Sequence, residues 1–226
     1  MLLVGHRGAR AYEPENTLRS FRKGIQLGAN AVEFDVRFTK DKKAVIVHDK
    51  DVDRTTNGKG LVKEYTLKAL KKLNAGKKER IPTLKEALTL VKKLKATPIV
   101  ELKEKSNVKE AVKEIGKSDA NAFVLSFHTE AIRQAKQIEP KLTAGLNFSN
   151  KIRNIQGFMR LGKVIKADWL FGEKKAINKQ LVDTAHKWKF KVAVWVCNTE
   201  ADIRKFLKLG VDGIASDKPD LFKSLK

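Results

Sequence analysis

Cysteine is almost missing from this sequence, since Cys197 is the single one among 226 residues. A disulfide framework and a cysteine-based metal cluster are therefore excluded. Long apolar runs are missing too: stretches such as Val192–Cys197 fall far short of the roughly 20 residues that span a bilayer. The N-terminal Met1–Gly5 is too short for the apolar region of a secretory signal. We therefore expect a cytoplasmic protein without a membrane span, whose mature chain begins at Met1.

Acidic residues are scarce as well, at 26 Asp and Glu against 48 Lys and Arg, which leaves a net charge of +22. Such a charge attracts phosphates, nucleic acids and anionic lipid surfaces alike, so it identifies no partner. Aromatic residues make up 7%, and recognisable nucleic-acid-binding motifs are absent, which argues against specific nucleic-acid recognition. Electrostatic binding to a backbone needs neither feature. A non-catalytic basic protein that binds nucleic acid therefore stays an alternative.

What the sequence does contain is a regular alternation of strand and helix patterns. Between the apolar strand-like stretches, apolar residues recur with the spacing of amphipathic helices. Eight such alternations predict an α/β fold, and specifically a (β/α)8 TIM barrel. An open doubly wound sheet is the runner-up, and its dinucleotide-binding form is disfavoured because no Gly-x-Gly-x-x-Gly turn follows the first strand. The stretches begin near Leu2, Ala31, Thr97, Ala122, Leu142, Ala167, Lys191 and Val211.

One interval between strands is much longer than the others. The starts at Ala31 and Thr97 are 66 residues apart, whereas the other starts are 20 to 29 apart. An excess of this size usually belongs to an inserted functional element. We therefore expect one catalytic domain over residues 1–226, with a small insertion after strand two at about 39–82. The expected helix-closing glycines are Gly28, Gly116 and Gly210, and the expected N-caps are Asn16, Ser106 and Thr199.

Two strands carry acidic residues on their inward face. In the strand at 31–38, Glu33 and Asp35 alternate with apolar residues, and Glu101 does so in the strand that begins near 97. Buried like charges are costly unless a cation or protons offset them. Three carboxylates form an oxygen-only site that suits one divalent ion, Mg²⁺ or Ca²⁺ with Mn²⁺ as a further candidate, rather than zinc. The alternative is a buried ion-pair network with Arg37 and Lys103.

The first strand ends in His6 and Arg7. In a barrel, these residues lie at the carboxyl ends of the strands, where active sites are built. A second histidine, His48, follows an expected hairpin turn at Asp41-Lys42. If those two residues form the turn, paired positions sum to 83 and His48 lies opposite Asp35.

Together these side chains suit the cleavage of a phosphodiester. A bound metal would hold a phosphoryl oxygen and activate a hydroxyl group. Arg7 and Lys103 would bind phosphate oxygens. One histidine would accept the nucleophile's proton and the other would protonate the leaving alcohol, because imidazole titrates near neutrality. Which of His6 and His48 does which stays open.

Several motifs, in order along nearly the whole chain, resemble the glycerophosphodiester phosphodiesterase family. The resemblance implies a (β/α)8 barrel, a divalent metal on Glu33, Asp35 and Glu101, and catalytic histidines at His6 and His48. It also implies substrate contacts from Arg7, Lys103 and Trp195. The motifs are His6-Arg7-Gly8, Glu13-Pro14-Glu15-Asn16-Thr17, Glu33-x-Asp35, His48-Asp49, Arg54-Thr55-Thr56-Asn57-Gly58, Glu101-x-Lys103, Trp195 with Asn198-Thr199, and Asp212-Gly213-Ile214 with Asp217.

The resemblance implies hydrolysis of a small glycerophosphodiester to sn-glycerol 3-phosphate and an alcohol. The glycerol hydroxyl next to the phosphate would act as an internal nucleophile, because it is already oriented for attack. A second alternative is a lysophospholipase D or sphingomyelinase D-like enzyme with the same catalytic groups. It would need an exposed apolar lip, for which the insertion offers few residues. The headgroup, the native metal and the oligomeric state are not predicted by the sequence.

Three other residues have lesser roles in this interpretation. His128 ends the fourth strand on the catalytic face, but a surface or packing role is favoured over substrate contact. His186, near a helix end, is expected to be structural. Cys197 is expected to be a small buried hydrophobe rather than a reactive thiol.

Overall fold

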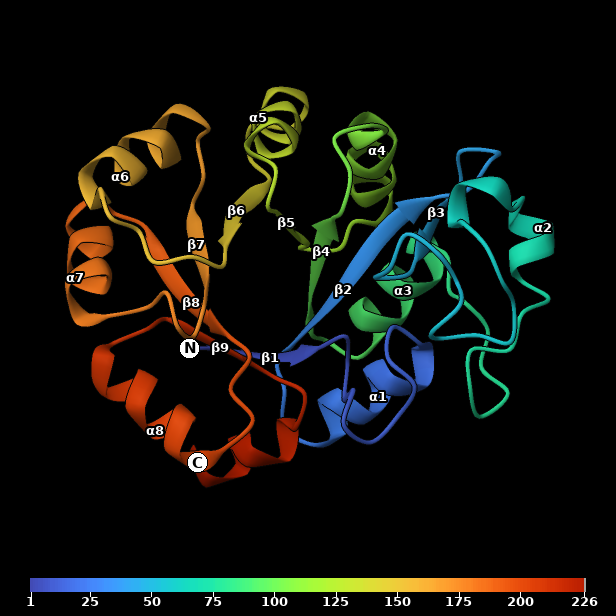
Figure 1. The fold of residues 1–226 in the computed structure, drawn as a ribbon, viewed down its shortest axis with the longest axis horizontal. Coiled ribbons are helices and arrows are strands. Elements are labelled where there is room, and N and C mark those ends of the chain that lie inside the picture. The colour runs from blue at the N-terminus through green and yellow to red at the C-terminus, as the bar shows by residue number, and fades with distance from the viewer. Residues whose placement is uncertain (226) are drawn as a thin grey trace.

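Parallel strands close into a barrel of eight in the computed structural model, which describes residues 1–225 (Figure 1). β9 pairs with β1, and β1 pairs with β2, so the barrel is closed and the open doubly wound sheet is excluded. The predicted (β/α)8 barrel is therefore confirmed, and each barrel strand begins within two residues of its expected start. In order round the barrel the strands are β1 (Leu2–His6), β2 (Ala31–Phe38), β4 (Thr97–Leu102), β5 (Phe123–Ser126), β6 (Thr143–Phe148), β7 (Trp169–Glu173), β8 (Lys191–Trp195) and β9 (Gly213–Ser216).

Helices surround the barrel on its outer side (Figure 1). Within residues 1–225, no helix combines the length and the apolar character needed to cross a bilayer. The helices of the ring are α1 (Leu18–Gln26), α3 (Leu84–Lys93), α4 (Val108–Ser118), α5 (Thr129–Ile138), α6 (Ile155–Val164), α7 (Lys179–Lys187) and α8 (Glu200–Leu209), and the 3₁₀ helix η2 (Pro219–Leu225) follows β9.

The helix starts agree with the sequence expectation in one case and correct it in another. Thr199 caps α8 as expected, through its side-chain oxygen, which accepts a hydrogen bond from the backbone of Asp202. Thr17, not Asn16, caps α1. The Asn16 amide is engaged elsewhere, because its Nδ2 donates to Asp35 Oδ2 at 2.8 Å. The expected N-cap was therefore one residue too early, and Asn16 instead binds the carboxylate of Asp35.

The expected ends of α4 were wrong, whereas the end of α8 was right. Gly210 closes α8 with a left-handed φ of 84°. Gly116 lies inside α4, which continues to Ser118 and is closed by Asp119 with a φ of 49°. Short polar residues tolerate this left-handed conformation better than most, so a glycine is not required there. At the other end of α4, the N-cap residue is Asn107 rather than the expected Ser106.

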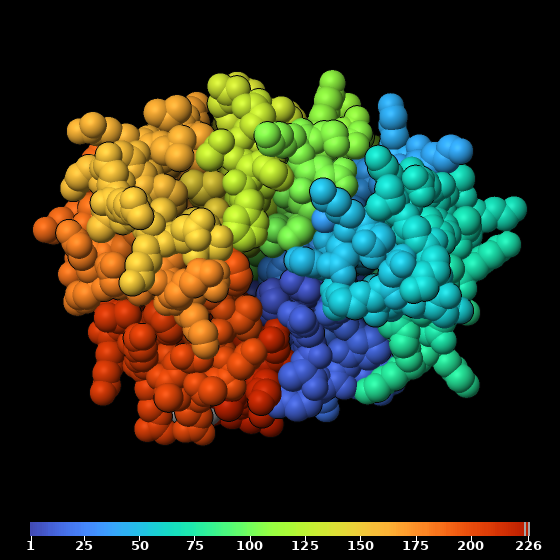
Figure 2. Space-filling model, in the orientation of Figure 1, coloured from blue at the N-terminus to red at the C-terminus, as the bar shows by residue number. Residues whose placement is uncertain are grey.

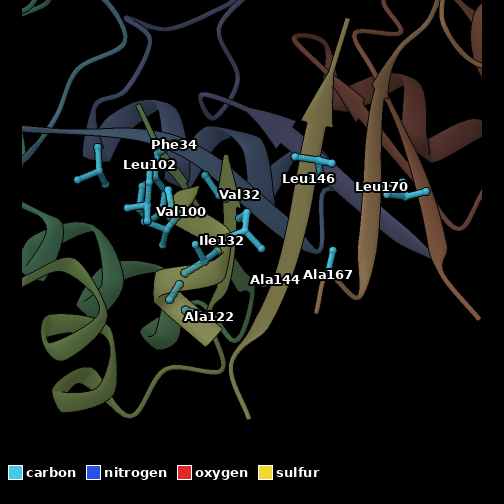
Figure 3. Packing of buried hydrophobic residues seen from close by; sticks show 14 of the residues in the cluster. Val32, Phe34, Val100, Leu102, Ala122, Ile132, Ala144, Leu146, Ala167 and Leu170 are labelled. Carbon is cyan, nitrogen blue, oxygen red and sulfur yellow. The ribbon is translucent and has the colours of Figure 1, made fainter. Parts of the chain in front are cut away.

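Apolar side chains pack on both sides of the barrel wall. Outward-facing residues such as Val32, Phe34, Val100 and Leu102 pack against the ring of helices (Figure 3). Inward-facing residues form a separate cluster that fills the lumen. There Phe123 meets Phe171 edge to face, with ring centroids 5.3 Å apart. The lumen is thus a packed core that supports the strand ends above it.

Residues 39–82 leave the barrel after β2 and fold into a small unit beside it, light blue to turquoise in Figure 1. The unit contains β3 (Ala44–Ile46), the 3₁₀ helix η1 (Val62–Glu64) and the short helix α2 (Leu67–Leu70). It has its own apolar cluster, which includes Val45, Val52, Val62 and Leu70. In Figure 2 this unit and the loop after β1 border a depression at the centre of the face.

The expected register of the hairpin between β2 and β3 was wrong by one residue. Val36 pairs with Ile46, so paired positions sum to 82 rather than 83. The turn contains three residues instead of two, and Lys42 adopts a left-handed φ of 55° within it. Val47, and not His48, therefore lies beside Asp35, to whose carbonyl its N–H donates at 3.0 Å.

Candidate active site at the mouth of the barrel

A cavity of about 140 Å³ opens at the carboxyl ends of the barrel strands. Most of the residues singled out from the sequence line it. Asp35 lies directly beside it, in the same acidic cluster as Glu33 and Glu101. The structure therefore brings together the whole set predicted from the sequence. The residues that line the cavity are Val4, His6, Arg7, Glu33, His48, Glu101, Lys103, Leu125, Phe127, Asn147, Phe171, Trp195 and Ala215.

The acidic cluster is built by the register of β2 and β4. Asp35 is the direct neighbour of Glu101 across this pair, and Glu33 lies two residues earlier on the same face of β2. One carboxylate oxygen from each residue lies within 4.8 Å of those from the other two. All three side chains are buried, Asp35 to 1% exposure. The alternation of side chains along β2 and β4 thus brings three carboxylate groups, which can bind a metal, close together.

The three carboxyl groups differ in their ionisation. Burial, together with the charges of Asp35 and Glu101, raises the pKa of Glu33 well above its ordinary value. Burial and Asp35 likewise raise the pKa of Glu101 to about 7. Burial alone would raise the pKa of Asp35 too, but Lys103, Arg7 and His48 outweigh it and the pKa is lowered. Burial and mutual repulsion therefore favour protons on Glu33 and Glu101, whereas Asp35 stays ionised beside Lys103 and Arg7.

Two oxygen atoms in this cluster show where a cation fits. Within the described residues, Glu33 Oε1 and Asp35 Oδ1 are buried and have no hydrogen-bond partner. Unpartnered buried carboxylate oxygens are costly, and hard divalent cations bind such oxygens. The buried triad is therefore compatible with one divalent metal ion.

The alternative of a buried ion-pair network with Arg37 and Lys103 neutralises only part of the charge of these carboxylates. Lys103 Nζ lies 2.8 Å from Glu101 Oε1 and 3.4 Å from Asp35 Oδ1. Arg37 instead pairs with Glu104 at 3.2 Å and donates to the backbone carbonyl of His48. Lys103 is thus a member of the cluster, whereas Arg37 braces the chain behind His48.

His6 is held by a carboxylate from the far end of the chain. Its Nδ1 lies 2.7 Å from Asp217 Oδ1, and its Nε2 is 3.9 Å from Glu33 Oε2. Burial would raise the pKa of Asp217, but its hydrogen bonds with His6 and Asn198 outweigh burial and the pKa is lowered. An ionised Asp217 can only accept, so Nδ1 of His6 carries a proton. Nε2 is then the atom presented to the acidic cluster.

His48 has the same arrangement with its neighbour in sequence. Its Nδ1 lies 2.6 Å from Asp49 Oδ1, and Arg54 Nε lies 2.6 Å from the other oxygen of Asp49. The hydrogen bond from Arg54 holds the pKa of Asp49 at about 2. Burial is the main reason why the pKa of His48 lies below its ordinary value. His48 therefore stays neutral to a lower pH than a free imidazole.

Glu15 links this pair to the first loop. Arg54 donates to both of its oxygens at 2.8 and 2.9 Å, and Arg7 Nη1 donates to it at 2.9 Å. Arg7 also donates its backbone N–H to Glu33 at 3.0 Å, and its Nε lies 3.3 Å from Asp35. Charged partners thus hold Arg7 on several sides, at the edge of the cavity.

The opposite wall of the cavity is mostly apolar. Phe127 and Trp195 meet edge to face with centroids 5.9 Å apart, and Trp195 Nε1 donates to the carbonyl of Phe171 at 3.3 Å. Leu125 completes this wall, and Asn147 is the polar side chain within it. The cavity therefore has a charged side on β1, β2 and β4 and an apolar side on β5 to β8.

Comparison with known proteins identifies the chain. The model of the glycerophosphoryl diester phosphodiesterase family matches residues 6–221. This chain belongs to that family. It is 32% identical over 240 residues to a glycerophosphodiester phosphodiesterase of Caldanaerobacter subterraneus subsp. tengcongensis, covering 99% of this chain and 97% of the relative. It is 30% identical over 254 residues to one from Bacillus subtilis strain 168, covering 100% and 86%.

Solved structures of similar proteins have the same fold. One is a phosphodiesterase of Oleispira antarctica in complex with the product sn-glycerol-3-phosphate, with a TM-score of 0.90, 29% identity and coverage of 99% of this chain and 96% of that one. Another is a glycerophosphodiester phosphodiesterase of Thermotoga maritima, with a TM-score of 0.86, 29% identity and coverage of 100% and 98%.

Some features of this family member were not singled out from its sequence. Phe127, Asn147 and Phe171 line the cavity, although nothing in their local sequence marks them. Each faces inward near the end of a barrel strand, so the period of two along the strands was the available signal.

His128 is not among the residues that line the cavity. Cys197 is buried, and burial raises the pKa of its thiol to about 12, which agrees with the expected inert role.

Proposed function

We propose that this protein hydrolyses glycerophosphodiesters to sn-glycerol 3-phosphate and an alcohol with the help of one divalent cation. The observation that carries the proposal is that His6 and His48, each hydrogen-bonded through Nδ1 to a carboxylate, line the same small cavity as the buried acidic cluster. The relatives named as glycerophosphodiester phosphodiesterases support it. So does the related structure in complex with sn-glycerol-3-phosphate.

Glu33, Asp35 and Glu101 would hold the cation, because one oxygen from each converges on a point, and Glu33 Oε1 and Asp35 Oδ1 lack a hydrogen-bond partner among the described residues. Mg²⁺ or Ca²⁺ suits this all-oxygen set, with Mn²⁺ as a further candidate. When bound, the cation would polarise a phosphoryl oxygen and lower the pKa of a hydroxyl group nearby. Lys103, beside Glu101, would add a positive charge for the phosphate oxygens, and Arg7 would do so from the other side.

The two histidines would transfer the protons. In each, the carboxylate at Nδ1 fixes the tautomer and the ring orientation, which leaves Nε2 for the substrate. One Nε2 accepts the proton of the attacking hydroxyl and the other donates a proton to the leaving alcohol. Asp217 and Asp49 stabilise the imidazolium that forms, as a carboxylate does behind other catalytic histidines. Trp195 would pack against the carbon atoms of the substrate.

The proposal assigns the whole chain to one catalytic domain, in which the insertion at 39–82 supplies His48 and Asp49. We also place the protein in the cytoplasm, since a single free cysteine suits a reducing compartment.

The release of glycerol 3-phosphate from glycerophosphocholine tests this proposal. We expect release with Mg²⁺, Ca²⁺ or Mn²⁺, loss of activity with a chelator, and a fall of about 10³-fold or more for His6→Ala and for His48→Ala. His186→Ala is the matched control, because His186 pairs with Asp212 in an exposed position. The proposal is wrong if no metal supports release, or if His186→Ala lowers the rate as much as the other two substitutions.

A second candidate substrate is a lysophospholipid, and one observation favours it. Phe127 is 41% exposed at the apolar side of the cavity, where an acyl chain could rest. Hydrolysis of glycerophosphocholine and of a long-chain lysophosphatidylcholine, compared under the same conditions, separates the two.

A further inference from the structure

Asn147 is a buried polar residue that the proposed mechanism does not use. It lies on β6, which is separated from β4 by β5 and lies across the barrel from β1. The acidic cluster, Lys103 and Arg7 are all on or next to β1, β2 and β4. Asn147 therefore lies across the cavity from Arg7 and two strands along the wall from Lys103.

The amide of Asn147 lacks a partner although it is buried. The residue is 5% exposed, and within the described part of the chain its Oδ1 has no hydrogen-bond partner. Its neighbours along the cavity wall are Leu125, Phe171 and Trp195, which offer mainly apolar surface. A buried amide without a partner costs free energy, and native structures rarely keep one without a ligand or a water to satisfy it.

The chemistry of an amide selects the kind of group that would bind. Asn offers a donor and an acceptor without net charge, and a hydroxyl group also offers both. A phosphate would be drawn to the cationic side instead, where Lys103 and Arg7 lie. A ligand held by its phosphate there would present to Asn147 the hydroxyl group farthest from phosphorus. Its carbon atoms would meet the apolar wall in between.

The size of the cavity favours a short ligand. Its volume of about 140 Å³ is well below the ~300–1,000 Å³ of pockets for drug-sized molecules. A three-carbon polyol phosphate suits this space, and an acyl group on the terminal hydroxyl would remove the donor and add bulk at Asn147.

We propose that Asn147 determines specificity by binding the terminal hydroxyl group of the glyceryl moiety, so that the cavity selects diesters whose glyceryl end is free. This inference rests on the proposed function and deepens it by naming the residue that recognises the free glyceryl end. It assigns lysophospholipids to the rejected substrates, because esterification of that hydroxyl leaves the amide partly unpaired.

The test compares glycerophosphocholine with its analogue that lacks the terminal glycerol hydroxyl. We expect the wild-type protein to prefer the complete substrate by about 100-fold or more in kcat/KM, since sites built to bind a hydroxyl strongly reject analogues without it. Asn147→Leu, which is close in shape, should lower kcat/KM for glycerophosphocholine by about 100-fold and leave the analogue within about threefold. Asn147→Ala should lose the same discrimination.

Asn154→Leu is the control. Asn154 caps α6 through a hydrogen bond to Gly157, so its replacement should lower Tm without changing discrimination. Asn147→Leu should keep or raise Tm, because it removes an unpaired buried amide.

Calorimetry on the metal-loaded protein adds a binding measurement. Asn147→Leu should weaken sn-glycerol 3-phosphate binding by about 100-fold and leave inorganic phosphate unchanged. Equal losses for both diesters, or unchanged discrimination in Asn147→Leu, would overturn the inference while the proposed function stands. A wild-type protein that cleaves neither diester would instead overturn the proposed function, and this inference with it.

Discussion

Asp217 accepts a 2.7 Å hydrogen bond from Nδ1 of His6, although 211 residues separate the two in the chain. The closure of the barrel through β9 and β1 brings them together, and Asn198 donates to the other oxygen of Asp217 at 2.8 Å. The imidazole is therefore fixed in one tautomer by a partner that is itself held in place.

Asp217→Asn should lower kcat by about 10²–10⁴-fold with little change in fold, because an amide can donate to Nδ1 and reverse the tautomer. Steady-state kinetics with circular dichroism checks this. Asp220→Asn is the matched control, since the Asp220 side chain bonds only to Tyr12 among the side-chain hydrogen bonds found in residues 1–225. A fall of less than about threefold in Asp217→Asn would mean that Asp217 does not orient His6.

Metal affinity should fall as the pH is lowered. The pKa of Glu101 is about 7, and burial raises that of Glu33 well above its ordinary value, so lowering the pH adds protons to the cluster that a cation must displace. Apparent affinity should therefore drop by about tenfold per pH unit for each displaced proton.

Isothermal titration of Mg²⁺ or Mn²⁺ in buffers of different ionisation enthalpy measures the protons released. More should be released at pH 6 than at pH 8.5, and Glu101→Gln should release fewer. Equal affinity and no proton release at the two pH values would contradict this assignment of the cluster.

Much of the acidic cluster could be predicted from the sequence, because strand alternation is a local property. The period of two in residues 31–38 places Glu33 and Asp35 on the inward face, and the same period places Glu101 there. The eight alternations of strand and helix patterns indicated the barrel because these patterns are local too. Neither result depends on which residues meet across the fold.

Contacts that depend on the geometry of a turn, or on segments far apart in the chain, could not be predicted from the sequence. The hairpin register was missed because one extra turn residue, with Lys42 in a left-handed conformation, shifts each pair. His48 still reaches the cavity, since it lies beyond the last paired residue and its position is set by Asp49 and the carbonyl contact of Arg37. Asp217 belongs to one of the family motifs, but its hydrogen bond with His6 depends on the closure of the barrel. For Asn147, strand alternation was the available signal.

The loop that carries Arg7 should depend on the absence of a side chain at Gly8. Its φ of 87° is left-handed, and a Cβ atom there would overlap the backbone and side chain of Ser20. Gly8→Ala should therefore lower the free energy of unfolding by about 2–4 kcal/mol, from the left-handed strain and overpacking together.

Gly210→Ala is the matched control for Gly8→Ala. Gly210 has a similar φ of 84°, but a Cβ atom there would meet nothing within 4 Å, so only about 1 kcal/mol should be lost. Urea denaturation of both variants gives the comparison. Equal losses would show that backbone strain alone, without the contact with Ser20, explains the glycine at position 8.

The hydroxyl group next to the phosphate should be required for cleavage. A neighbouring hydroxyl on the substrate is already positioned, and a cavity of about 140 Å³ between charged and apolar walls favours attack from within the substrate over capture of a separate water. The nucleophile would then lose its proton to one histidine and close a cyclic phosphate, while the bond from phosphorus to the choline oxygen breaks and the other histidine protonates the leaving choline. Water would open the cyclic phosphate in a second step. An analogue of glycerophosphocholine without that hydroxyl should bind as a competitive inhibitor and release no choline. Choline release from the analogue at a rate near that of glycerophosphocholine would instead establish direct attack by water, with His6 and His48 acting on that water.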